Sequence, residues 1–140
     1  MAMPWYVEFH NDQGIVETIY EGLLSPIELQ AAIGAALAVG REKAATRYLS
    51  DCLRMEGGHS IVDLSKMVDL IDGQGVSRSV RVAVLFAPES DVTEMVKFWK
   101  TCAGNRGFKV QLFLERESAL TWLLSAPPFR SEAGAGLRRD

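Results

Sequence analysis

The segment from Val80 to Phe86 is almost continuously apolar, with Arg81 as its single charged residue. A short strand of this composition is typical of a sheet that is covered on both faces, because neither face then meets water. The segment therefore predicts a central strand in a sheet against which helices pack.

Strand and helix patterns alternate on both sides of this segment. Trp5–His10 and Ile15–Tyr20 are rich in aromatic and β-branched residues and flank a short turn, which predicts a β-hairpin. Further strands are expected at Arg47–Cys52 and Lys109–Leu114, a loop at Leu53–His59, and helices at Pro26–Val39, Ser60–Asp72, Asp91 to Gly104 or Gly107, and Arg116–Ser125. Strands that are separated by helices cannot pair as hairpins. The order ββαβαβαβα therefore predicts an α/β fold with a mixed, mostly parallel sheet, an N-terminal β-hairpin and about four helices.

Capping patterns mark where the helices begin and end. Ser25 and Glu28 form a capping box, and Gly40 is expected to end the helix that they begin. Ser60 precedes an apolar run with helical spacing and is predicted to cap the second helix. Asp91 is predicted to cap the third helix in the same way.

Length and composition fit one folded domain with a short tail. The chain has 140 residues, of which 48% are hydrophobic and 24% are charged, so it can bury a core without disulfides or metal ions. Residues 1–126 are expected to form this domain. Pro127 and Pro128 prevent the last helix from continuing, and the residues beyond them have little to bury, so 127–140 are expected to form a flexible tail.

Charge and hydropathy argue against several classes of partner. The 18 acidic and 15 basic residues give a net charge of −3, which offers nucleic acid no broad positive field. No segment approaches the roughly 20 apolar residues that span a bilayer, and no secretory signal is evident, so a cytoplasmic protein is expected. Cys52 and Cys102 lack the close spacing of a redox or zinc motif. They are expected to be buried free thiols, and no cofactor is predicted.

Several local patterns follow one another in a set order along the chain. They are Tyr48–Asp51 as a strand that ends in an acid, Arg81–Leu85 as the central strand, Asn105–Gly107 before Val110–Phe113, and Ala119–Leu123 at the close. In this order and spacing, over roughly Val7 to Leu124, they resemble the SpoIIAA-like family, whose small domains are related to the STAS anti-sigma-factor antagonists. The resemblance implies a SpoIIAA/STAS-like fold and a non-enzymatic regulatory or protein-interaction module. Similarity in shape to Sec14-type lipid-binding domains implies the alternative, a carrier of a small apolar molecule or lipid.

A candidate regulatory or ligand-binding rim follows from the predicted sheet, because ligands of such sheets bind at the carboxyl ends of the parallel strands. The polar residues that fall at this edge are Asp51, Glu56, His59 and Ser60. The resemblance implies a phosphorylatable serine at the start of a helix, where Ser60 stands, although the Asp-Ser-Ser-Gly-like motif of the anti-sigma antagonists is absent. Capping alone already explains Ser60.

Catalysis and metal binding are not expected at this rim. His59 has no oriented nucleophile, metal or cofactor beside it, and neighbouring side chains on one segment seldom face each other. His10, His59, Cys52 and Asp51 share no recognised metal-ligand spacing. We therefore predict no catalytic residue and no metal site.

The predicted helix Pro26–Val39 carries no charge after Glu28. Small residues line much of the surface that its core stripe leaves free, and they form a candidate interface: Ala31, Gly34, Ala35 and Ala38. Small side chains allow another backbone to approach closely, which favours a protein partner or a homodimer. The alternative is that alanine stands here as a good helix former that tolerates water. Met95, Phe98, Trp99 and Trp122 are interpreted as core residues, with an apolar ligand pocket as the alternative.

Overall fold

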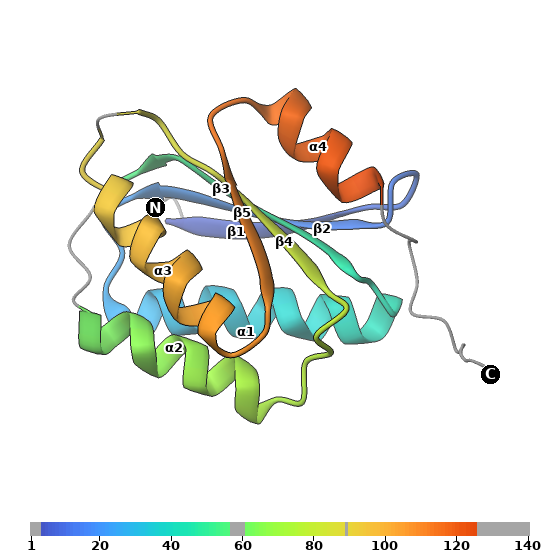
Figure 1. Cartoon of the computed structure of the whole chain (residues 1–140), viewed down its shortest axis with the longest axis horizontal. Helices are drawn as coiled ribbons and strands as arrows, with labels where there is room; N and C mark the ends of the chain where they lie inside the picture. The colour runs from blue at the N-terminus through green and yellow to red at the C-terminus, as the bar shows by residue number, and fades with distance from the viewer. Residues whose placement is uncertain (1–3, 57–60, 89, 126–140) are drawn as a thin grey trace.

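A computed structural model describes residues 4–56, 61–88 and 90–125, which form a five-stranded sheet and four helices (Figure 1). The elements are β1 (Trp5–His10), β2 (Ile15–Gly22), α1 (Pro26–Lys43), β3 (Arg47–Met55), α2 (Ile61–Gly73), β4 (Arg81–Leu85), α3 (Thr93–Asn105), β5 (Lys109–Phe113) and α4 (Arg116–Leu124). The predicted α/β order is confirmed. The predicted tail 127–140 lies outside the described residues.

The sheet has the strand order β1-β2-β3-β4-β5. β1 and β2 form the predicted antiparallel hairpin, in which Glu8 lies opposite Glu17 and His10 opposite Ile15. All other neighbouring strands are parallel, since a helix connects each of them to the next. The expectation of a mixed, mostly parallel sheet is therefore confirmed.

The helices divide unequally between the two faces of the sheet. α1, α2 and α3 cover one face, and α4 lies alone on the other (Figure 1). The larger core lies under the three helices and includes Tyr20, Leu64 and Val84. A smaller core lies under α4, where Ala119 and Leu123 pack against the sheet. None of the helices in the described part of the chain has the length and apolarity needed to cross a membrane.

The start of α1 is as predicted, but its end is not. The Ser25 side chain accepts a hydrogen bond from the Glu28 backbone at 3.1 Å, and the Glu28 side chain accepts one from the Ser25 backbone at 2.8 Å. The prediction that Gly40 ends the helix is wrong. α1 continues to Lys43 and ends where Ala44 adopts a left-handed φ of 54°.

Gly40 has a packing role instead. It is buried, and a Cβ atom at this position would lie 1.7 Å from Tyr48 Oη. The ring of Tyr48 therefore occupies the space that any larger residue at position 40 would need.

The end of β3 and the start of α3 also differ from the prediction. β3 does not end at Cys52, because β2 continues to Gly22 and keeps pairing with β3 as far as Met55, after a shift in register beyond Ile19. Asp91 does not cap α3. The helix begins at Thr93 without a side-chain cap, and the fully buried Val92 anchors its start against the core.

Candidate functional site

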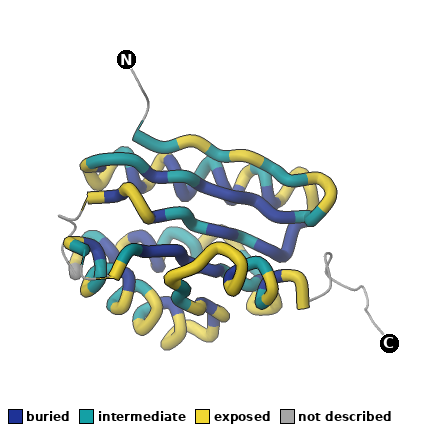
Figure 2. The backbone as a smooth tube through the Cα atoms, turned by 90° about the horizontal axis from the view of Figure 1, so that it is seen from above, coloured by how far each residue is buried: buried dark blue, intermediate teal, exposed yellow. Residues whose placement is uncertain are grey.

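The face of the sheet that carries α4 is only partly covered. α4 packs on β3, β4 and β5, and in Figure 2 strands β1 and β2 lie beside it. A hollow of about 320 Å³ lies on the uncovered part. Side chains alternate between the faces of a strand, and alternating residues from Tyr6 to His10 of β1 and from Glu17 to Glu21 of β2 line this hollow. We call the cluster of Glu8, His10, Glu17, Asp51 and Arg116 that lines it the open-face cluster.

Glu17 is the centre of the open-face cluster. Its side chain is 3% exposed. Arg116 donates two hydrogen bonds to its carboxylate, from Nη1 to Oε2 at 2.8 Å and from Nη2 to Oε1 at 2.6 Å, and His10 Nε2 lies 2.7 Å from Oε1. A buried carboxylate without such partners would be strongly destabilising, so these contacts explain how the charge is tolerated.

The positions of these residues follow from the fold. The hairpin register sets Glu8 directly opposite Glu17, a pair of like charges that destabilises a sheet unless a cation lies near. α4 begins at Arg116 and brings the guanidinium over β2. Asp51 stands on the other side of this guanidinium, with Oδ2 3.9 Å from Arg116 Nη1.

Burial and hydrogen bonding oppose each other at Glu17. Burial raises the pKa of this carboxyl, but the hydrogen bonds from Arg116 and His10 outweigh it and hold the pKa below its ordinary value. The hydrogen bonds to Glu17 also raise the pKa of Arg116. Both groups are therefore charged at neutral pH and form an ion pair.

The two cysteines lie in or against the apolar core under α1, α2 and α3. Cys52 is buried and Cys102 is half-buried, and both are free. Burial raises the pKa of the Cys52 thiol to about 12. Cys52 is therefore a protonated core residue at neutral pH and not a nucleophile.

The structure describes Asp51 and Glu56 of the predicted rim. Asp51 belongs to the open-face cluster, and Glu56 is exposed just after β3, where its backbone N–H donates to the Gly22 carbonyl at 2.8 Å. His59 and Ser60 lie outside the described residues. The grouping of these four residues stays a prediction, as does the role of Ser60 as a helix cap.

The sequence interpretation did not identify His10, Glu17 or Arg116 as a cluster. The hairpin register and the alternation of side chains could have placed Glu8, His10 and Glu17 together on one face. One ligand atom from each of these three lies within 4.8 Å of the other two, a proximity that a search for spacing motifs could not detect. Arg116 joins them from 99 positions away along the chain.

The candidate interface residues lie on the outward side of α1. Ala31 and Ala38 are exposed, and Gly34 and Ala35 are half-buried. A Cβ atom at Gly34 would meet nothing within 4 Å. Ile27 extends the same side by one turn and is 78% exposed. Beside it, a groove of about 520 Å³ separates α1 from α2.

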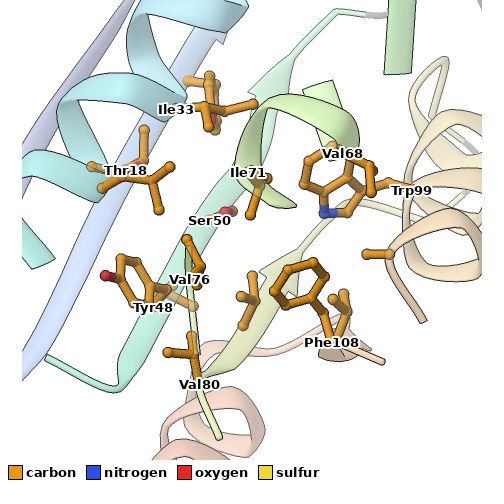
Figure 3. Close-up of a pocket in the computed structure, with 17 residues that line it drawn as sticks. Thr18, Ile33, Tyr48, Ser50, Val68, Ile71, Val76, Val80, Trp99 and Phe108 are labelled. Atoms are coloured by element: carbon orange, nitrogen blue, oxygen red, sulfur yellow. The ribbon is translucent and has the colours of Figure 1, made fainter. Parts of the chain in front are cut away.

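Two adjoining apolar pockets lie between the sheet and the helices α1, α2 and α3. Their volumes are about 80 Å³ and 70 Å³, and Tyr20, Ser50 and Trp99 line both of them. Figure 3 shows Ser50 near the middle of the larger pocket, between Tyr48 and Trp99. Met95 and Phe98 pack against the same core, as their interpretation as core residues requires.

Comparison with known proteins identifies the class of fold. No family model matches the chain, and no curated protein matches it. The chain has a SpoIIAA-like fold. It is similar to the crystal structure of an uncharacterised protein of the DUF3478 family with this fold, from Shewanella loihica PV-4, with a TM-score of 0.50 and 19% sequence identity over 85% of this chain and 91% of that one. The fold that the sequence resemblance implied is thereby confirmed.

Proposed function

We propose that the chain is a non-enzymatic interaction module of STAS-like type that pairs with a second copy of itself through the outward side of α1. The observation that supports this proposal is the lack of charged side chains along much of that side. Between Glu28 and Arg41 the exposed residues of α1 are uncharged, although the helix lies on the surface; they are Gln30, Ala31 and Ala38. Most surface helices carry charged residues on this face.

The shape of the surface supports the same proposal. Ala31, Gly34 and Ala38 form a low stripe that lets another helix approach closely, and Ile27 projects at one end of it. In a two-fold pair of antiparallel helices centred near Gly34, Ala31 of one copy would lie opposite Ala38 of the other.

The groove between α1 and α2 would add to the area that the outward side of α1 can bury against a second copy. A stable interface buries about 1,200–2,000 Å² in total, which is more than a single helix face supplies. The groove next to Ile27 is lined by both helices, so a second copy on α1 would also contact α2. The predicted homodimer therefore requires both helices.

The test places charge on the outward side of α1. Ala31→Glu with Ala38→Glu adds two carboxylates at exposed positions and keeps good helix formers there. We expect the wild type to be a dimer and this variant a folded monomer in size-exclusion chromatography with light scattering. Thr101→Glu with Thr121→Glu adds the same charge at exposed positions on α3 and α4 and should stay dimeric. A wild type that is monomeric at every concentration, or a charged variant that stays dimeric, would contradict the proposal.

Binding of a small apolar molecule is the second candidate function. It is favoured by the two adjoining pockets beneath the helices, which are lined almost wholly by apolar side chains. Each pocket is smaller than the cavity of about 150 Å³ that holds a benzene molecule. A ligand would therefore have to be very small or spread the helices from the sheet, and this makes the function second to pairing.

A further inference from the structure

The hairpin side of the open-face cluster gathers three groups with metal-binding chemistry. Glu8 and His10 belong to β1 and Glu17 to β2, and one ligand atom of each lies within 4.8 Å of the other two. His10 Nε2 is 2.7 Å from Glu17 Oε1 and 3.9 Å from Glu8 Oε1. Imidazole with two carboxylates is a donor set that suits zinc and similar divalent cations.

We infer that Glu8, His10 and Glu17 form a binding site for a divalent cation of the zinc type. Donor atoms around a tetrahedral zinc ion lie about 3.4 Å apart, given bonds of about 2.1 Å. The separations of His10 Nε2 from Glu17 Oε1 and from Glu8 Oε1 lie on either side of this value, so the three side chains need only rotate to surround an ion. The hollow in front of the three residues has room for a water molecule as a further ligand.

Arg116 competes with the cation for Glu17. It donates to both carboxylate oxygens, and its positive charge would repel a metal ion bound to Oε1. The Arg116 side chain is 46% exposed and has a second carboxylate nearby, because Asp51 Oδ2 lies 3.9 Å from its Nη1. Binding of the cation would therefore move the guanidinium from Glu17 toward Asp51. Substitutions of Glu8 and of Arg116 should therefore change the affinity for the cation in opposite directions.

The experiment measures the affinity of the purified full chain for Zn²⁺ alone, by isothermal titration calorimetry. Glu8 has a side chain that is 52% exposed, so Glu8→Gln should fold normally while it weakens Zn²⁺ binding by about tenfold or more. Arg116→Met should tighten binding by about tenfold, because it removes the competing cation. Glu21→Gln changes a carboxylate that lines the same hollow outside the three ligands, and it should leave the affinity unchanged.

The opposite signs of the first two variants separate a metal site from a structural ion pair. Absence of Zn²⁺ binding by the wild type would overturn the inference. Binding that is insensitive to Glu8→Gln would place the ion elsewhere in the chain and would also overturn it. A loss of affinity in folded Arg116→Met would show that Arg116 supports the site and does not compete with the metal, which contradicts the proposed exchange.

Discussion

One side of the sheet lies under three helices and is apolar, whereas the other side lies under α4 alone and carries a buried carboxylate. On the first side, stability comes from the apolar packing of α1, α2 and α3 against the strands. On the second side, Glu17 depends on hydrogen bonds from Arg116 and His10. The apolar side therefore stabilises the fold, whereas the other side holds charged groups that could bind a ligand.

Leu64 offers the strongest test of the apolar side. It is 3% exposed and packs from α2 into the larger core. Leu64→Ala should lower the free energy of unfolding by about 2–5 kcal/mol, because it leaves a cavity in a packed region. Leu53→Ala removes the same atoms at a position that is 43% exposed, and in urea denaturation it should cost less than about 1 kcal/mol. Equal losses in the two variants would contradict the packing account.

Two glycines of α1 sharpen the comparison within a single helix. Gly40→Ala should destabilise the protein by about 1–3 kcal/mol, because the new Cβ meets Tyr48 Oη. Gly34→Ala has open space around it and should stabilise an isolated copy by about 0.5–1 kcal/mol through helix propensity. In the monomeric Ala31→Glu/Ala38→Glu background, thermal unfolding of the two variants should thus shift in opposite directions. A Gly40→Ala variant as stable as its background would mean that Tyr48 does not occupy the space beside Gly40.

The pH dependence of stability tests the polar side. The pKa of Glu17 is below its ordinary value of 4.5 in the folded chain, so its charge contributes stability above that pH. The contribution is lost as the pH falls through the lowered pKa. Glu17→Gln should therefore cost about 1–2 kcal/mol at neutral pH and progressively less in acid. A difference between wild type and variant that stays constant from neutral to acidic pH would contradict the ion-pair assignment.

The two sides of the sheet also differ in how much of their structure could be predicted from the sequence. The order of strands and helices, and the capping box at Ser25, follow from local periodicity and were predicted correctly. The end of α1 was predicted wrongly. Gly40 does not end the helix; a glycine is needed there because Tyr48 on the next strand fills the space beside it. Arg116 and Glu17 meet only because the side chain at the start of α4 reaches over β2, and no local pattern predicts that contact.

The function proposed for α1 rests on the uncharged stretch of its outward surface between Glu28 and Arg41, and native mass spectrometry of the freshly purified chain tests it most directly. This measurement reports the oligomeric state and any retained small molecule together. We predict a dimer whose mass equals two chains, with no apolar ligand retained. A monomer at every concentration, especially one that carries an apolar molecule, would contradict pairing through α1 and would favour the pockets beneath the helices as the functional site.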